Sequence, residues 1–153
     1  MLQIFTSKKH LAVMAFAMLC TTANALEKSV TLTEAGTLSN QIAAGEKLNI
    51  TNLTVTGPIN AADILFIREM AGCGKRPSEK TEGKLQRLNL QAANITKSDN
   101  SYFFMKKGMV EKGYGVSDNN LVDHYMFYGC EKLVEVTLPT STQKINNYAF
   151  FGC

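Results

Sequence analysis

The chain has 153 residues, with 16 Lys and Arg against 13 Asp and Glu and a formal net charge of +3 at pH 7. Two of the basic residues, Lys8 and Lys9, lie in a leader that we expect to be removed, which leaves 14 basic and 13 acidic residues. This near-neutral balance argues against the basic surface of a nucleic-acid-binding protein, although a local charged patch is not excluded. About 128 residues remain after the leader, enough to bury one modest hydrophobic core.

Residues 1–25 have the pattern of a secretory signal peptide. The basic pair Lys8 and Lys9 precedes a short apolar run over residues 11–20, and a stretch of small residues ends at Ala25. The apolar run is too short to cross the ~30 Å hydrocarbon core of a bilayer, which argues against a transmembrane helix. We therefore expect a mature chain that is secreted or displayed at the cell surface, with no membrane span.

The following segment, residues 26–72, is predicted to be a mixed α/β cap. Residues 29–33 alternate between apolar and polar side chains, as a half-buried strand does. Asn60 is suited to cap a helix over residues 61–70, and Gly72 is suited to end it. A stack of repeats needs a cap of this kind over its first open core layer.

One strand pattern recurs along the rest of the chain. KLQRLNL, residues 84–90, matches KLVEVTL, residues 132–138, and a looser copy lies at residues 50–55. In the copy at 132–138, valine and leucine alternate with polar residues, so Val134, Val136 and Leu138 are expected to face a core. The spacing between copies is irregular, and turn-forming residues predict two inserted loops, at about residues 72–83 and 98–120.

A nine-residue block is repeated at the end of the chain. VDHYMFYGC, residues 122–130, returns as INNYAFFGC, residues 145–153, a period of 23 residues. This period and the intervening Leu-x-x-Val-x-Leu strand fit a leucine-rich repeat. Because one such unit cannot bury its apolar face alone, the units must stack, with Phe127 and Phe150 inside.

The predicted fold class is therefore a leucine-rich-repeat solenoid. Short parallel strands with irregular or helical return paths are expected over residues 73–153, after the mixed α/β cap. In this pattern a strand follows the Gly-Cys pair of each block, but the sequence stops at Cys153. We expect a fragment of a longer repeat protein or a truncated gene product, with an uncovered apolar layer in its last turn.

Removal of the leader would leave the cysteines Cys73, Cys130 and Cys153. An odd number cannot form a closed disulfide framework. Cys130 and Cys153 hold equivalent positions in the two blocks, so both are expected to be buried, unpaired thiols that pack as small hydrophobes. Neither a C-x-x-C nor a His-x₃₋₅-His spacing occurs, so no zinc site is expected.

Residues 122–153 resemble the BspA-like leucine-rich repeats, whose units read roughly A-F-x-G-C-x-x-L-x-x-V-x-L-P…I-x-x-x-A-F. The matching positions are Phe127, Gly129, Cys130, Leu133, Val136, Leu138, Pro139, Ile145, Ala149 and Phe150, and Met126 departs from the usual Ala. Residues 26–121 are more loosely similar to the leading segment of exported bacterial repeat proteins. The resemblance implies a right-handed solenoid at the cell surface or outside the cell, adhesion to host matrix proteins in some members, and no catalytic residues.

The candidate binding residues are the outward-facing strand positions. On a stack of repeats these side chains line up from turn to turn on one extended face, which is usually the binding face. The alternative is a surface that is merely solvated. The candidates are Arg87, Asn89, Glu135 and Thr137.

No catalytic, cofactor or metal residues are expected. The turn over residues 72–75 carries Gly and Lys, but it lacks the first Gly of a phosphate-binding loop and has Arg76 where Ser or Thr is needed. His124 is the only histidine after the leader, and without a second His or a reactive Ser or Cys context it does not suggest a catalytic triad.

The functional hypothesis is an exported or cell-surface repeat module that binds a host or envelope macromolecule, an extracellular protein or glycan, without catalysis. An extended surface gains affinity from area and complementarity and needs no catalytic group. One alternative is a recognition or spacer domain of a larger secreted enzyme whose catalytic part is missing here. A second alternative is a structural stalk on the cell envelope.

The pattern of the leader predicts where the exported chain is cleaved. Cys20 allows a lipoprotein as the alternative, but lipoprotein cleavage requires a small residue before the cysteine, and Leu19 stands there. We therefore expect cleavage between Ala25 and Leu26, so N-terminal sequencing of the exported product should begin at Leu26. An exported product that begins with a lipid-modified Cys20 would overturn this assignment.

Overall fold

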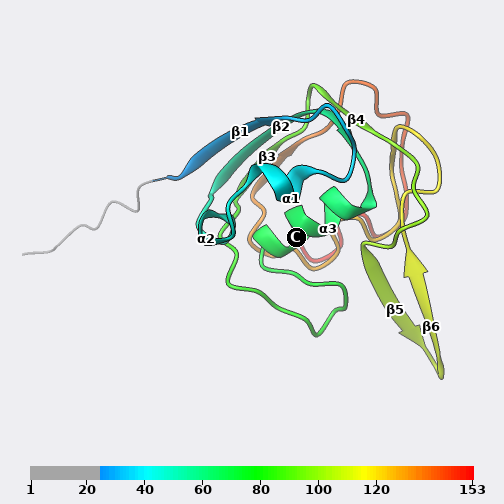
Figure 1. The fold of residues 1–153 in the computed structure, drawn as a ribbon. Coiled ribbons are helices and arrows are strands. Elements are labelled where there is room, and N and C mark those ends of the chain that lie inside the picture. The colour runs from blue at the N-terminus through cyan, green and yellow to red at the C-terminus, as the bar shows by residue number, and fades with distance from the viewer. Residues whose placement is uncertain (1–24) are drawn as a thin grey trace, which may run out of the picture.

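A computed structural model describes residues 25–153, so the expected signal peptide over residues 1–25 lies almost entirely outside the described residues. In this described part short strands dominate, and its three helices precede residue 71 (Figure 1). The elements in chain order are β1 (Glu27–Thr31), α1 (Leu38–Gln41), α2 (Ala44–Lys47), β2 (Asn52–Ile59), α3 (Ala61–Met70), β3 (Arg87–Asn89), β4 (Ala93–Ile95), β5 (Phe103–Lys107), β6 (Val110–Tyr114), β7 (Leu121–Val122), β8 (Glu135–Thr137) and β9 (Lys144–Ile145). Within residues 25–153, no helix combines the length and apolar character that a bilayer crossing needs.

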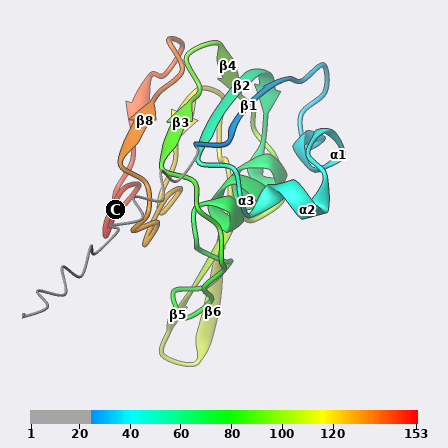
Figure 2. The ribbon, with the colours of Figure 1, turned by 90° about the vertical axis from the view of Figure 1, so that its left-hand side faces the viewer.

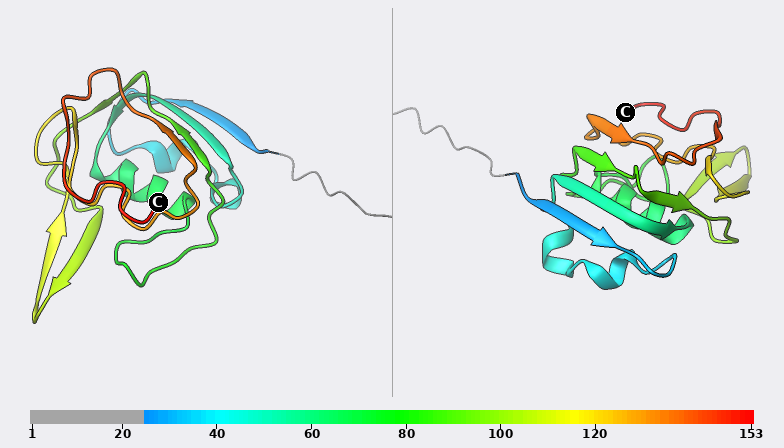
Figure 3. Two further views of the ribbon diagram at one scale, coloured as in Figure 1. Left: turned by 180° about the vertical axis from the view of Figure 1, so that it is seen from behind. Right: turned by 90° about the horizontal axis from the view of Figure 1, so that it is seen from above.

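The main sheet is parallel, with the strand order β1-β2-β3-β8, and β4 pairs with the far end of β2. The four strands lie side by side in Figure 2, and the view from above in Figure 3 shows successive layers of chain from β1 to the C-terminal segment. In that view α1 and α2 lie at the β1 end of the layers. The prediction of short parallel strands joined by irregular segments is thus confirmed.

The register of the sheet places apolar residues in interior rows. Leu53 of β2 is paired with Leu88 of β3, which is paired with Val136 of β8. Leu53 and Leu88 are each 1% exposed, while Val136 is half-buried. Because side chains alternate between the two faces of a strand, the residues on either side of this row point away from the core.

Helix α3 forms where the sequence predicted it. The Asn60 side chain accepts a hydrogen bond from the N–H of Ala62 at 2.9 Å, and the Asp63 side chain accepts one from the N–H of Asn60 at 2.9 Å, which is a capping box. Ile64 and Ile67 are fully buried under the sheet. Asp63 also accepts the backbone N–H groups of residues 36 and 38, so the helix start anchors the segment after β1.

The two repeat blocks stack as parallel return paths. The N–H of Phe127 donates to the carbonyl of Ala149 at 2.7 Å, and the Phe127 ring stacks on Phe150 with centroids 5.4 Å apart. Phe127 and Cys130 are fully buried, as expected, while Phe150 is half-buried. Gly129 takes a positive φ of 70°, which fits the predicted tight bend.

Three local expectations are wrong. Residues 98–120 were expected to be a loop, but β5 and β6 form an antiparallel hairpin there that projects from the body (Figure 1). Val134 was expected to face the core, but it is 76% exposed because β8 begins only at the next residue. Cys153 was expected to be buried, but it is exposed because no described segment packs over the second repeat block.

The burial pattern predicts a large difference between two substitutions. Phe127→Ala empties a fully buried aromatic site and should lower the free energy of unfolding by roughly 3–5 kcal/mol. Glu135→Ala changes an exposed side chain and should alter the free energy of unfolding by less than about 0.5 kcal/mol. Urea unfolding followed by circular dichroism measures both values. Equal midpoints for the two variants would mean that the inside and outside positions are misassigned.

Candidate binding surface

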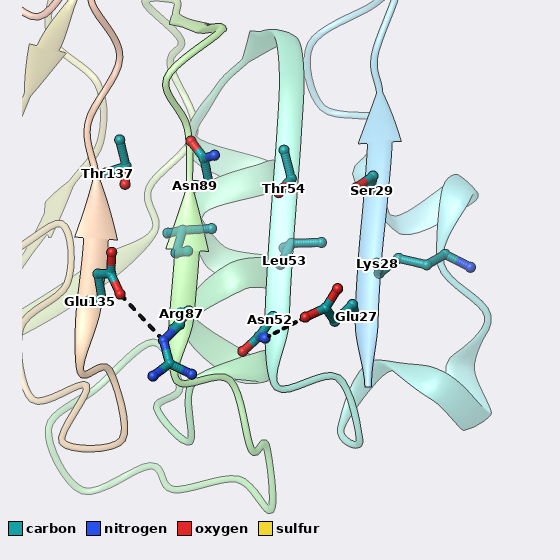
Figure 4. Close-up of a pocket in the computed structure, with 11 residues that line it drawn as sticks. Glu27, Lys28, Ser29, Asn52, Leu53, Thr54, Arg87, Asn89, Glu135 and Thr137 are labelled. Atoms are coloured by element: carbon teal, nitrogen blue, oxygen red, sulfur yellow. Dashed lines mark hydrogen bonds and ion pairs between the residues drawn. The ribbon is translucent and has the colours of Figure 1, made fainter. Parts of the chain in front are cut away.

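The four candidate binding residues lie together on the outer face of the parallel sheet. Arg87 is paired with Glu135 across β3 and β8, and Asn89 is paired with Thr137 in the same register. Figure 4 shows that these side chains continue onto the next two strands. The sheet register therefore brings together all four residues that the sequence singled out.

The complete surface consists of two polar rows that cross four strands. Each row contains one residue from each of β1, β2, β3 and β8, in the order of the strands. We call these eight residues the polar strand face. The first row is Glu27, Asn52, Arg87 and Glu135, and the second is Ser29, Thr54, Asn89 and Thr137.

Four of the eight residues of the polar strand face were not predicted from the sequence. Glu27 and Ser29 of β1 and Asn52 and Thr54 of β2 join the face only because β1, β2 and β3 lie side by side in the sheet. The irregular spacing between the copies of the strand pattern did not predict this strand order. A signal was present, because residues 29–33 and 50–55 have the same two-residue alternation as the clearer copies. Extending the outward positions to those segments would have pointed to Ser29, Asn52 and Thr54.

The first row is held by weak, exposed contacts. Arg87 Nε lies 3.3 Å from Glu135 Oε2, and their side chains are 57% and 63% exposed. Exposed ion pairs of this kind contribute only about 0–1 kcal/mol, so either partner can turn to an incoming charged group at little cost. Asn52 Nδ2 donates to Glu27 Oε1 at 3.1 Å, whereas Asn52 Oδ1 is buried and accepts no hydrogen bond within residues 25–153.

The second row offers hydroxyl and amide groups. Asn89 Oδ1 accepts the N–H of Gln91 at 2.9 Å, which orients the Asn89 side chain. The face as a whole lines a shallow hollow of about 230 Å³. It can donate and accept hydrogen bonds over the width of four strands, and it presents no nucleophile paired with a base.

Candidate catalytic and metal groups are not gathered at this face. Within residues 25–153, no three His, Cys, Asp or Glu side chains converge in a way that could hold a metal ion. His124 lies on the return path rather than on the strands, and it is half-buried. The turn over residues 72–75 belongs to the loop that follows α3.

Asp123 lies in a network of hydrogen bonds on the return path of the first repeat block. Its carboxylate accepts hydrogen bonds from Ser117 Oγ and N–H, from the N–H of His124 and from Asn146 Nδ2. Burial alone would raise the pKa of Asp123, but these hydrogen bonds outweigh it and hold the pKa below its ordinary value. Asp123 is therefore an ionised acceptor that ties the first repeat block to Asn146 of the second.

A separate aromatic surface lies on the return paths. Tyr125 and Tyr148, at equivalent positions of the two blocks, stack with centroids 5.2 Å apart and planes 10° from parallel. Both take a positive φ, 60° and 61°, which is rare for a bulky side chain. With Tyr114 and Lys112 they line a second hollow of about 250 Å³. The recurrence of Tyr in both blocks was the sequence signal for this stack.

Comparison with known protein families finds a match for one segment of the chain, the segment that contains the two repeat blocks. No curated protein matches the sequence. Residues 97–153 match the family model described as the BspA type leucine rich repeat region (6 copies). This segment contains both repeat blocks and strand β8 between them. Over residues 97–153 the chain is thus similar to the BspA-type leucine-rich repeats.

Proposed function

We propose that the chain is an exported or cell-surface leucine-rich repeat module that binds an extracellular protein through the polar strand face, with a role in adhesion or recognition and no catalysis. The observation that carries this proposal is the alignment of eight polar side chains in two rows across four parallel strands. Export rests on the signal-peptide pattern of residues 1–25. The family match supports a binding module, because repeats of this type present an extended surface.

In this proposal the fold is the beginning of a solenoid. Residues 26–72 form the cap and residues 73–153 form the repeats. Two observations support it: α1 and α2 lie at the β1 end of the layers, and both repeat blocks follow the same path with the same glycine bend (Figure 3). The hairpin of β5 and β6 is then an insertion within the repeats.

The shape of the polar strand face favours a large partner over a small molecule. Small-molecule sites are usually concave pockets of roughly 300–1,000 Å³ with mostly apolar walls. The hollow here is shallow, measures about 230 Å³ and is lined mainly by charged, amide and hydroxyl groups. Such a surface gains affinity by contacting many groups of an extended partner.

The side-chain types favour a protein partner. Sugar rings commonly stack on exposed aromatic rings, and none of the eight residues of the polar strand face is aromatic. Asn52, Asn89 and Thr137 can exchange hydrogen bonds with peptide groups, while Arg87 and Glu135 can pair with side chains of opposite charge.

The test compares two charge reversals in binding experiments. Purified chain is passed over a panel of immobilised host extracellular-matrix proteins and purified envelope glycans, and surface plasmon resonance identifies a protein that binds. Arg87→Glu should weaken that binding at least about 10-fold, equivalent to about 1.4 kcal/mol. Lys106→Glu, which reverses an exposed charge on β5, is the matched control and should change it less than about twofold.

Two outcomes would contradict the proposal. One is binding that Lys106→Glu weakens as much as Arg87→Glu does, because the contact would then not be specific to the polar strand face. The other is a response to glycans alone, lost through changes at the aromatic hollow rather than at Arg87.

A double variant tests whether the partner reads the direction of the ion pair. Arg87→Glu with Glu135→Arg keeps an ion pair but exchanges the positions of its two charges, so it should also fail to bind.

A further inference from the structure

Three segments of the chain converge on the aromatic hollow, which is separate from the polar strand face. Strand β6 supplies two of its residues, and each repeat block supplies a tyrosine and the residue before it. The lining residues are Lys112, Tyr114, His124, Tyr125, Asn147 and Tyr148. Because these segments are distant in the sequence, the hollow exists only in the folded chain.

The rings of the aromatic hollow are anchored in the core. Tyr148 stacks on Tyr125 with centroids 5.2 Å apart, and Tyr125 stacks on Phe103 with centroids 5.4 Å apart and planes 21° from parallel. Phe103 is fully buried, whereas Tyr148 is 54% exposed. The Tyr114 ring is tilted by 58° against the Tyr125 ring, with centroids 4.6 Å apart. The column of three stacked rings therefore runs from the core to the surface and fixes the orientation of its outermost ring.

The backbone at the two tyrosines is unfavourable for a bulky residue. Tyr125 and Tyr148 take φ values of 60° and 61°, in the left-handed region that Gly and Asn adopt more easily. Gly or Asn would relax the turn, yet both blocks carry Tyr. Strained backbone of this kind is concentrated at functional sites, so the position of the two rings is a candidate for a role in binding.

An exposed tyrosine ring is suited to contact a sugar ring. The face of an aromatic ring carries partial negative charge, and the C–H groups of a sugar carry partial positive charge, so the two surfaces attract each other. Pyranoses of the glucose type in the β configuration have only hydrogen atoms in axial positions, which gives each a flat apolar side. The exposed part of the Tyr148 ring offers a flat surface that matches it.

Polar groups beside the rings can bind the hydroxyl groups of a sugar. Asn147 is exposed, and its side-chain amide can both donate and accept hydrogen bonds. Lys112 is also exposed, its Nζ lies 5.2 Å from the centroid of the Tyr114 ring, and the ion pairs within residues 25–153 do not include it. A few polar groups around an apolar floor are the combination that orients a ligand in a binding site.

The size of the aromatic hollow favours one unit of a longer chain. The hollow measures about 250 Å³, below the roughly 300–1,000 Å³ of pockets that enclose a whole small molecule. We propose that it binds a β-linked pyranose unit of the glucose type within a glycan, with Tyr148 stacked on the sugar ring and Asn147 and Lys112 bound to its hydroxyl groups. This site is additional to the polar strand face and takes a different class of ligand.

The test is an NMR titration of the isotope-labelled chain with two β-linked disaccharides, cellobiose and N,N′-diacetylchitobiose. Sorbitol, which has hydroxyl groups but no ring, is the control ligand. At least one disaccharide should shift the backbone amide signals of Tyr125, Asn147 and Tyr148, and sorbitol should not. Tyr148→Asn should weaken this binding at least about 10-fold, whereas Tyr148→Phe keeps the ring and should change it less than about threefold. Because Asn tolerates a positive φ, Tyr148→Asn should remain folded.

Three results would overturn the proposal. The first is the absence of any shift with either disaccharide at about 20 mM. The second is Tyr148→Asn protein that is folded by its amide spectrum and binds as tightly as the unchanged chain. The third is a set of shifts centred on the polar strand face and lost in Arg87→Glu.

The two binding surfaces can be tested independently of each other. Arg87→Glu should leave disaccharide binding unchanged, and Tyr148→Asn should leave protein binding unchanged. A chain that binds only glycans, through Tyr148, would support the sugar site and contradict the proposed function. A chain that binds only a protein, through Arg87, would do the reverse.

Discussion

The in-register parallel pairing of β1, β2, β3 and β8 is the constraint on which the rest of the structure depends. Each strand is short and buries only one face, so it is stable only when its apolar residues meet those of its neighbours. Leu53, Leu88 and Val136 form such a row across three strands. A slip of one residue in β3 would expose Leu88 and bury Arg87, so the burial of the leucine enforces the register. The residues that flank this row point to the opposite face of the sheet, where the same register aligns them as the polar strand face.

The return paths are held together by different forces. There the two repeat blocks stack ring on ring, with Tyr125 against Tyr148 and Phe127 against Phe150. Arg68 reaches from α3 to three backbone carbonyls of the first block, which joins this helix to the repeat blocks. The strand side is therefore left free to present polar groups, while the opposite side supplies the packing that keeps it in shape.

The sequence predicted the features that depend on neighbouring residues and missed those that depend on distant ones. Helix α3 and its Asn60 cap follow from local signals, and the outward positions of β3 and β8 follow from alternation. The hairpin of β5 and β6 was missed because its glycines and polar neighbours suggest a loop, and only five residues on each side pair. The contact of Arg68 with the first repeat block could not be inferred, because three of its acceptors are backbone carbonyls about 60 positions later, at residues 125–128. Every residue has a backbone carbonyl, so the sequence does not single these acceptors out. The environment of Val134 likewise depends on where β8 begins, which alternation alone does not decide.

The register of the sheet is the claim that can be measured most directly. Parallel neighbours in register bring the backbone of Thr54 next to Asn89 and that of Asn89 next to Thr137. In nuclear Overhauser spectra of the isotope-labelled chain, we expect cross-strand contacts that link Thr54, Asn89 and Thr137 in this order. Contacts that instead link Thr54 to Leu88 or Leu90 would show a register shifted by one residue. That result would turn Arg87 and Asn89 toward the core and contradict the polar strand face.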